Sequence, residues 1–337
     1  MEPRVGYVLA HEQFSPGNLI EYAVAAEEAG FGGVWASDHF HPWQDNQGHG
    51  GHAWITLAAI GQRTRHVALG TGVTCPAYRY HPAIVAQAFA SLGALYPGRV
   101  FLGVGTGEAL NELALGGGWG PYAERSARLK EAITLIRRLW TEDWVASDGP
   151  IFPIPDAKLY TKPPSPLPIY IAASGPRSAA LAGELGDGWI TSADAMPPRP
   201  EMADALRAGV ELAQKDRKRF EVLVELYVVV GDEDEAVEAA RLWQFGPVMD
   251  RVISVSDPRV IQRLAESMSS PQRTARPWVV GVDPAVHIES VNRLFAAGAT
   301  QVYIHSPQAD QIKVIEFYRR EVLPALPARP TPSGRDA

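Results

Sequence analysis

Short apolar runs of strand length alternate along the chain with longer amphipathic segments. The apolar runs predict strands at residues 4–10, 33–37, 66–73, 99–104, 168–173, 188–191, 220–230 and 300–304. The amphipathic segments predict helices at residues 16–30, 82–95, 122–139, 176–185, 201–214 and 309–323. Ser15 as an N-cap and Gly30 as the closing residue support the first of these helices.

This alternation favours a (β/α)8 TIM barrel, in which each strand is followed by a connection that contains a helix. An open doubly wound sheet is the competing arrangement, but the dinucleotide-binding fingerprint does not follow the first strand. We expect one barrel domain over residues 1–323, with insertions at about residues 144–166 and 243–277. Residues 324–337 carry too little apolar surface to fold, and we expect a mobile tail there.

Composition narrows the class of protein. Of 337 residues, 46% are hydrophobic and 20% are charged, which is typical of a folded globular chain. The net charge of −7 argues against a nucleic-acid partner. The single cysteine, Cys75, allows no internal disulfide and suits a reducing compartment. Residues 1–10 show no secretory signal pattern, and no apolar run is long enough to span a membrane, so we expect a cytoplasmic protein.

Glycine and proline are unusually common, with 31 and 28 residues, or about 17.5% of the chain against about 12% on average. This excess predicts many turns. In a TIM barrel the chemistry lies at the carboxyl ends of the strands. Polar and glycine-rich segments that directly follow the predicted strands are therefore the candidate site, and three clusters qualify.

The first cluster, SDHFHPW at residues 37–43, places an acid, two imidazoles and an indole close together after the second strand. The alternative interpretation is a solvated loop in which Asp38 caps a turn. We also considered a metal site built from the histidines of this region, His39, His41, His49 and His52. Their spacing matches no zinc pattern and no thiolate accompanies them, so we expect no bound metal.

The other two clusters are rich in small residues. GVGTGEALN at residues 103–111 carries alternating glycines that let the backbone approach a flat ligand, and Glu108 and Asn111 project from the following turn. AASGP at residues 172–176 opens a helix, which suits an anionic phosphate at the helix N-terminus. An ordinary N-cap by Ser174 is the alternative interpretation of the latter segment.

These clusters together resemble a known family. The chain is similar over nearly its whole length to the luciferase-like, deazaflavin-dependent oxidoreductases, and most of all to the F420-dependent glucose-6-phosphate dehydrogenase group. The motifs that carry the resemblance are SDHFHPW at residues 37–43, RYHPAIVAQAFASLGALYPGRVFLGVGTGEALNE at 79–112, YIAASGP at 170–176 and GDGWIT at 186–191. The long GVGTGEALNE stretch makes the resemblance specific for the family, but not for a substrate.

The resemblance implies a deazaflavin, coenzyme F420, on the carboxyl-terminal face of the barrel. His39 would accept the proton of the substrate hydroxyl, Trp43 would position the substrate, and Glu108 would protonate or hydrogen-bond the cofactor ring. The residues implied to bind the cofactor are Asp38, Gly72, Val73, Cys75, Gly107, Asn111, Ala173, Ser174, Gly175 and Thr191. Gly72 and Val73 would form a bulge behind the ring, with a non-prolyl cis peptide bond between them.

The sequence departs from the glucose-6-phosphate enzymes where they bind the sugar phosphate. Their two lysine positions correspond here to Asp194 and Val252, and their arginine position to Pro277. Arg251 and Arg276 lie one residue away, so a shifted alignment restores two positive charges. An acid at a phosphate site disfavours binding. We therefore expect an alcohol, sugar or ketone other than glucose 6-phosphate.

The resulting hypothesis is an F420-dependent dehydrogenase or reductase that acts on CH–OH groups as a homodimer. One alternative retains the fold but binds FMN, giving a luciferase-like monooxygenase. Gly72 and Cys75, which replace a serine and a threonine of the glucose-6-phosphate enzymes, leave this alternative open. The other alternative is a non-catalytic flavin-binding protein.

Overall fold

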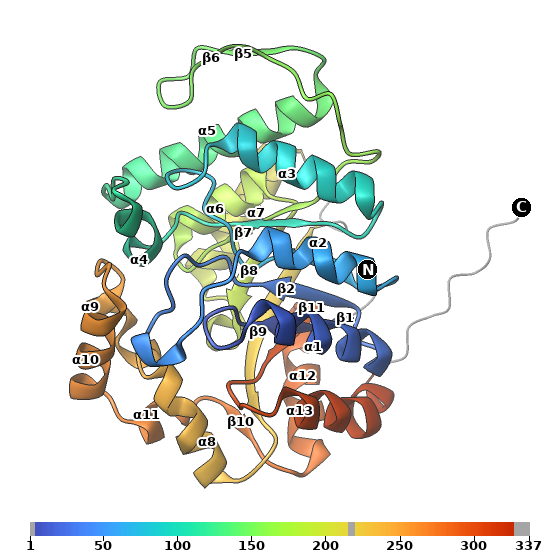
Figure 1. Ribbon diagram of the computed structural model, residues 1–337, viewed down its shortest axis with the longest axis vertical. Coiled ribbons are helices and arrows are strands. Elements are labelled where there is room, and N and C mark those ends of the chain that lie inside the picture. The colour runs from blue at the N-terminus through green and yellow to red at the C-terminus, as the bar shows by residue number, and fades with distance from the viewer. Residues whose placement is uncertain (1–3, 215–219, 327–337) are drawn as a thin grey trace, which may run out of the picture.

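A computed structural model describes residues 4–214 and 220–326 as a barrel of eight parallel strands surrounded by helices (Figure 1). The barrel strands are β1 (Arg4–Leu9), β2 (Gly33–Ala36), β3 (Ala68–Thr71), β4 (Leu102–Val104), β7 (Ile169–Ala172), β8 (Gly188–Ser192), β9 (Glu221–Val229) and β11 (Gln301–His305). Each lies within or overlaps a predicted strand. The predicted TIM-barrel fold is therefore confirmed.

The strand order closes the sheet into a ring. Hydrogen-bonded neighbours follow the order β3-β2-β1-β11-β9-β8-β7-β4. The two end strands are joined by parallel bridges between Leu69 and Val100 and between Thr74 and Val104. The Thr74 N–H donates to the Gly103 carbonyl at 2.9 Å. This closure excludes the open doubly wound sheet.

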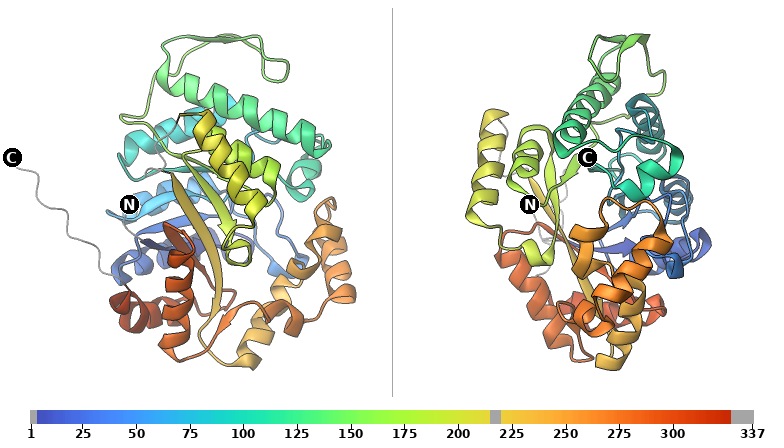
Figure 2. Two further views of the ribbon diagram at one scale, coloured as in Figure 1. Left: turned by 180° about the vertical axis from the view of Figure 1, so that it is seen from behind. Right: turned by 90° about the vertical axis from the view of Figure 1, so that its left-hand side faces the viewer.

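The helices pack around the outside of the barrel (Figures 1 and 2). Those that connect or follow barrel strands are α1 (Pro16–Ala29), α2 (Ala53–Arg63), α3 (Pro82–Leu95), α4 (Ala109–Glu112), α5 (Tyr122–Thr141), α6 (Pro176–Leu185), α7 (Pro200–Leu212), α12 (Pro284–Ala296) and α13 (Gln311–Phe317). Three of them, α2, α4 and α12, were not among the predicted helices. In α2 the N-cap residue His52 makes no side-chain capping bond, so the usual start signal is absent there.

Two segments extend the basic barrel. The antiparallel hairpin of β5 (Val145–Ser147) and β6 (Ile154–Ala157) projects beyond α3 and α5, at the top of Figure 1. Between β9 and the short strand β10 (Val279–Val280) lie four helices on one flank of the molecule: α8 (Glu233–Ala240), α9 (Met249–Val252), α10 (Pro258–Met268) and α11 (Pro271–Ala275). Strand β10 pairs with β9 in parallel.

Large side chains fill the barrel interior because glycines face them. The rings of Trp35 and Tyr303 stack with centroids 4.0 Å apart. A Cβ atom on Gly6 would lie 2.4 Å from the Tyr303 ring, and one on Gly72 would lie 2.8 Å from the Trp35 ring. Trp35 therefore forms the floor directly beneath the end of β3, where part of the candidate site lies.

The C-terminal segment changes pitch along its length. After α13 the chain forms a wider turn at Tyr318–Val322 and a 3-10 turn, η8, at Leu323–Ala325. The expected tail begins within that last turn, at Pro324. Its remainder from residue 327 onward lies outside the described residues.

Candidate functional site

Four neighbouring strands carry most of the predicted site residues at their carboxyl ends. Asp38 and His39 follow β2, Gly72 and Val73 follow β3, and Glu108 follows β4. The segment 173–175 follows β7, which pairs with β4. Since β2, β3, β4 and β7 are consecutive around the barrel, these residues line one continuous arc of its rim.

Asp38 is buried and fully engaged. Its Oδ2 accepts a hydrogen bond from Thr74 Oγ1 at 2.6 Å. Arg79 Nη2 donates to Asp38 Oδ1 at 3.1 Å, and Tyr80 donates its hydroxyl proton to the same oxygen at 3.3 Å. The side chains of Arg79 and Asp38 are 6% and 1% exposed. Asp38 therefore ties the β2 and β3 loops together, and the alternative of a solvated turn cap is wrong.

His39 faces a buried carboxylate that no sequence motif indicated. Its Nδ1 atom lies 3.6 Å from Glu12 Oε1, and both side chains are buried. Ser37 donates its hydroxyl proton to Glu12 Oε2 at 2.5 Å, which fixes the carboxylate behind the imidazole. This arrangement places a carboxylate beside the imidazole of the residue that the family resemblance implies as the proton acceptor.

Trp43 belongs to the same loop and lies against the segment that follows β9. Its ring stacks on the Phe245 ring with centroids 4.7 Å apart and an interplanar angle of 13°. The His39 and Trp43 rings are 5.5 Å apart. The loop is tied to that segment by Gln44, whose Oε1 accepts the Phe245 N–H at 3.0 Å. The predicted catalytic pair His39 and Trp43 therefore lies together at one position of the rim.

Glu108 begins the short helix α4 and is held by a neighbour. Asn111 Nδ2 donates to Glu108 Oε2 at 3.1 Å. The Asn111 Oδ1 atom accepts the backbone N–H groups of Phe40 and His41, at 2.8 and 3.3 Å. Asn111 is buried and thus joins the β4 loop to the β2 loop. Its polar atoms are already occupied by protein groups.

The turn after β3 contains the cis peptide bond between Gly72 and Val73 that the family resemblance implies. Cys75 is buried beneath the rim, where burial and the nearby Glu112 carboxylate raise the pKa of its thiol well above its usual range. Gly107 has a positive φ of 79°, and a Cβ atom there would lie 2.7 Å from Cys75 Sγ. Cys75 therefore packs against the buried side of the turn at Gly107.

Glu112 is a buried acid close to this cluster. Its Oε2 accepts the Arg79 N–H at 2.8 Å, and its Oε1 has no hydrogen-bond partner among the described residues. Burial raises the pKa of the Glu112 carboxyl to about 7, against the opposing effect of the Arg79 contacts. The loops after β2, β3 and β4 thus enclose a charged network beneath the rim.

The β7 end differs from the sequence interpretation in one detail. Helix α6 has Gly175 as its N-cap, so the alternative of a Ser174 cap is wrong. Ser174 is exposed, and a Cβ atom on Gly175 would meet nothing within 4 Å. Ala173 is buried, and its carbonyl accepts the Trp189 indole N–H at 2.8 Å. Thr191 pairs with Val224 in the β8–β9 ladder, one strand beyond this turn.

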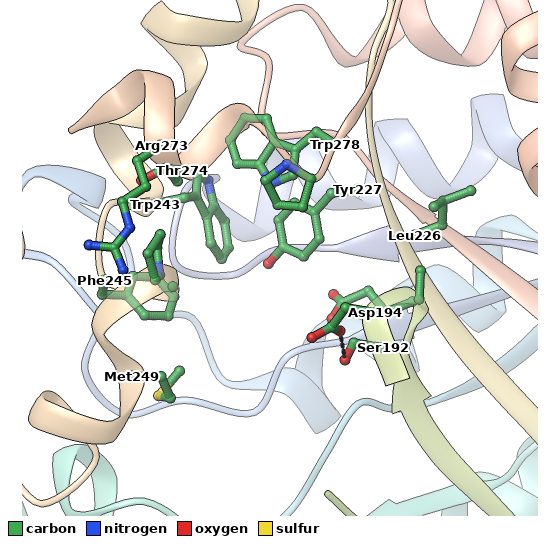
Figure 3. A pocket seen from close by; sticks show the side chains of 15 residues that line it. Ser192, Asp194, Leu226, Tyr227, Trp243, Phe245, Met249, Arg273, Thr274 and Trp278 are labelled. Carbon is green, nitrogen blue, oxygen red and sulfur yellow. Dashed lines mark hydrogen bonds between the residues drawn. The ribbon is translucent and has the colours of Figure 1, made fainter. Parts of the chain in front are cut away.

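Two connected cavities open beside the rim. An inner chamber of about 210 Å³ is bordered by His39, Trp43, Gly72 and Glu12. An outer cavity of about 530 Å³ lies between the end of β8 and the segment after β9, as Figure 3 shows. The residues that line both spaces are Glu225, Tyr227, Trp243, Phe245 and Met249. Because these residues are shared, the two spaces adjoin.

Comparison with known proteins agrees with this geometry. The sequence profile described as luciferase-like monooxygenase matches residues 3–301. The chain belongs to the luciferase-like monooxygenase family. A family relative, the F420-dependent hydroxymycolic acid dehydrogenase of Mycobacterium tuberculosis, is 50% identical over 96% of this chain and 88% of its own length. The F420-dependent glucose-6-phosphate dehydrogenase of Kribbella flavida is 42% identical over 97% of this chain and 99% of its own length.

Solved structures give the same result. An F420-dependent secondary alcohol dehydrogenase, in complex with an F420–acetone adduct, superposes with a TM-score of 0.91. It is 34% identical over 97% of this chain and 100% of its own. The long-chain alkane monooxygenase LadA, at 14% identity over 96% of this chain and 91% of its own, shares the fold with a TM-score of 0.73. The predicted resemblance to F420-dependent members of the luciferase-like family is confirmed.

The positions aligned with the family's phosphate-binding residues are not equivalent in space. Asp194 and Pro277 line the outer cavity, whereas Val252 is fully buried in α9. Val252 therefore presents no side chain to the outer cavity, in keeping with the expected loss of a cation at this position. Arg251 pairs with Asp250, and neither Arg251 nor Arg276 is among the described residues that line the cavity. Arg273, which the sequence did not indicate, does line it.

Sequence reasoning also missed a second carboxylate–imidazole pair. His305, at the end of β11, contacts Glu225 of β9 with 2.7 Å between Nδ1 and Oε1. The Tyr227 ring stacks on His305 with centroids 4.2 Å apart. Both members of the pair line the inner chamber. The position of His305 at the carboxyl end of β11 could have indicated it, whereas Glu225 lies in the middle of β9, and no local motif surrounds either residue.

Within residues 4–214 and 220–326, no group of three or more histidine, cysteine or acidic side chains is arranged to hold a metal ion. Among the same residues, no helix is both long enough and apolar enough to cross a membrane.

Proposed function

We propose that the chain is an F420-dependent oxidoreductase that transfers hydride between a CH–OH substrate, an alcohol, sugar or ketone, and coenzyme F420. The observation that carries this proposal is the inner chamber. There His39, with Glu12 behind it, lies beside Trp43 and opens toward Gly72 at the rim. The F420 dependence of the relatives that match nearly the whole chain supports the choice of cofactor.

The rim residues fit a cofactor with a flat ring and an anionic tail. Gly107 brings the backbone to the surface of the β4 turn, where Glu108 is half-buried. The N-terminus of α6 is open in front of Gly175, and such a position attracts a phosphate. Asp38, Cys75 and Asn111 would act indirectly, since their partners are protein groups that shape the loops around the ring.

The remaining cofactor-binding residues of the proposal lie on the same arc or, for Thr191, on the next strand, β8. Val73 and Gly72 would lie behind the ring, and Ala173, Ser174 and Thr191 would border its tail. Coenzyme F420, when bound, supplies a carbon that accepts or returns hydride. His39 would hold the hydroxyl proton, Glu12 would stabilise the resulting imidazolium, and Trp43 would orient the substrate. Glu108 would hydrogen-bond or protonate the cofactor ring.

We further propose that glucose 6-phosphate is not the substrate. Asp194 places a carboxylate at the outer cavity where a phosphate requires a cation. Arg273 is exposed, and its Nη1 donates to the Met268 carbonyl at 3.3 Å. An uncharged substrate avoids the repulsion from Asp194.

A cofactor titration and a substrate screen test the proposal. Purified protein is titrated with F420 and with FMN, followed by fluorescence, and then incubated anaerobically with F420 and an alcohol panel while the cofactor absorbance is recorded. We expect F420 binding and loss of its absorbance. Tight FMN binding without F420 binding would instead support the monooxygenase alternative.

Site variants separate an enzyme from a non-catalytic flavin-binding protein. His39→Ala should lower turnover by about 10²–10⁴, as expected for loss of a general base. Glu108→Ala should also lower turnover. If F420 binds but neither variant changes any measured activity, the binding-protein alternative holds.

We also propose a cytoplasmic homodimer. The lone Cys75, which is free and buried, suits a reducing compartment. Ile55 of α2 and Ile84 of α3 are 69% and 53% exposed and provide apolar surface for a second copy. Sedimentation velocity of the purified protein would reveal the dimer, and a monomer at micromolar concentration would contradict it.

A further inference from the structure

Five aromatic rings form a continuous contact path from the inner chamber into the outer cavity. Trp43 stacks on Phe245 at 4.7 Å between centroids, and Phe245 contacts Trp243 at 5.7 Å. Trp243 meets Tyr227 edge-on at 5.7 Å, and Tyr227 stacks on Trp278 at 5.6 Å with an interplanar angle of 15°. We call these five residues the aromatic ladder.

Four of the ladder rings, those of Tyr227, Trp243, Phe245 and Trp278, line the outer cavity together with Asp194 and Ser192 (Figure 3). The remaining lining includes the apolar side chains of Leu226, Pro247, Met249 and Pro277. Aromatic and aliphatic side chains bind an apolar group most favourably, because the contact removes both apolar surfaces from water.

Three polar side chains of this lining, Ser192, Thr274 and Glu225, already have partners. Ser192 donates its hydroxyl proton to Asp194, and Thr274 donates to the Ser270 carbonyl at 3.1 Å. Glu225 contacts His305, as described above. A sugar bound here would lose water from several hydroxyl groups that then face aromatic rings. Because these three protein side chains keep their present partners, they do not replace the lost hydrogen bonds, and the binding free energy is weakened.

The ladder is also held rigidly by hydrogen bonds that lie behind it. The Trp243 indole N–H donates to Gln13 Oε1 at 3.2 Å. The Phe245 N–H donates to Gln44 Oε1, and Gln44 is fully buried. The indole N–H of Trp243 is thus occupied by the β1 loop. A wall of this kind needs no reorganisation to accept an apolar ligand.

We propose that the outer cavity binds an extended apolar substituent of the substrate, such as an alkyl chain, while the carbon that bears the hydroxyl group occupies the inner chamber at His39. The substrate class is therefore an alcohol, or the corresponding ketone, with a long apolar chain rather than a sugar. This inference rests on the proposed function for the position of the reacting carbon.

The test is a series of 2-alkanols from 2-propanol to 2-decanol with F420 under anaerobic conditions. In the wild-type protein, kcat/KM should rise about fourfold per added methylene until the cavity is filled. Trp278→Ala should flatten this dependence on chain length, and Trp278→Phe should retain part of it. Trp144→Ala is the matched control, because Trp144 is exposed and lies outside the described cavity lining. A flat wild-type series, or glucose as a better substrate than 2-decanol, would overturn the inference.

A binding measurement distinguishes failure of this inference from failure of the proposed function. Calorimetry with 2-butanone, 2-heptanone and 2-undecanone, without cofactor, should show affinity that increases with chain length and a negative heat-capacity change. This chain-length dependence without any F420 turnover would refute the proposed function but retain the cavity assignment. Turnover of short alcohols, with no gain in ketone affinity along the series, would refute the cavity assignment alone.

Discussion

The Nδ1 atom of His39 lies 3.6 Å from a carboxylate oxygen of Glu12, and both side chains are buried at the floor of the inner chamber. This pairing joins the end of β1 to the end of β2. It places a fixed negative charge next to the imidazole to which we assign the substrate proton.

Replacing Glu12 should therefore impair proton acceptance. We expect Glu12→Gln to lower kcat by about 10²-fold, because the neutral amide stabilises an imidazolium less than a carboxylate does. Glu12→Asp should recover part of the activity. Steady-state kinetics with F420 and the best alcohol of the screen measure the effect. Glu235→Gln, at an exposed carboxylate, is the control and should be unchanged. Equal kcat in Glu12→Gln and wild type would contradict the role assigned to the pair.

The buried ion pair between Arg79 and Asp38 should be essential for stability. Arg79→Met leaves the Asp38 carboxylate buried without its cation, which we expect to cost about 3–5 kcal/mol of unfolding free energy. Arg63→Met removes an ion pair with Glu21 that is more than half exposed, and it should cost less than about 1 kcal/mol. Urea unfolding of both variants provides the comparison. Similar losses in the two variants would contradict this assignment.

Glu112 should make stability depend on pH. Its folded-state pKa of about 7 lies above the ordinary value of 4.5, so the folded protein retains a proton that the unfolded chain releases. This contribution is complete below about pH 4.5 and is lost as the pH rises to about 7, an effect of about 3 kcal/mol. Glu112→Gln should remove it. Urea unfolding at pH 5 and pH 8 gives the unfolding free energy of the wild type minus that of the variant. This difference should fall by about that amount between pH 5 and pH 8. A difference that stays constant would contradict the raised pKa.

Glucose 6-phosphate should be a poor substrate. We expect its kcat/KM to lie at least about tenfold below that of the best uncharged alcohol, because Asp194 repels a phosphate. Asp194→Lys should narrow this gap by raising kcat/KM for glucose 6-phosphate. Competition between the two substrates in one anaerobic assay measures the ratio directly. Turnover of glucose 6-phosphate equal to that of the best alcohol would show that Asp194 does not set this specificity.

Most of the barrel could be predicted from the sequence because each strand is a short apolar run next to turn residues. The ends of β2, β3, β4 and β7 were recognisable since each carries a compact motif, such as the glycines around Glu108. Helix α2 was missed because its N-cap, His52, lacks a side-chain capping bond. Helix α12 does carry a local start signal, the Asp283 cap followed by Pro284.

The contacts that complete the site could not be predicted, because they join residues far apart in the chain. Glu12 stands next to His39 only when β1 and β2 pair, and His305 meets Glu225 only through β11 and β9. Alignment by short motifs also could not show that Val252 is buried, since a motif does not reveal which face of α9 packs inward. Side-chain burial depends on the packed tertiary structure, so the structure was needed to find Arg273 and the aromatic ladder.

The rim of the barrel is divided between two sets of neighbouring strands. The ends of β2, β3, β4 and β7 carry most of the residues assigned to the cofactor, while the ends of β8 and β9 with the segment after β9 surround the outer cavity. Because few residues serve both halves, mutations that reshape one need not disturb the other. Lineages of this family can therefore acquire new substrates by replacing the β9–β10 segment, and that segment is the natural target for redirecting the enzyme by directed evolution.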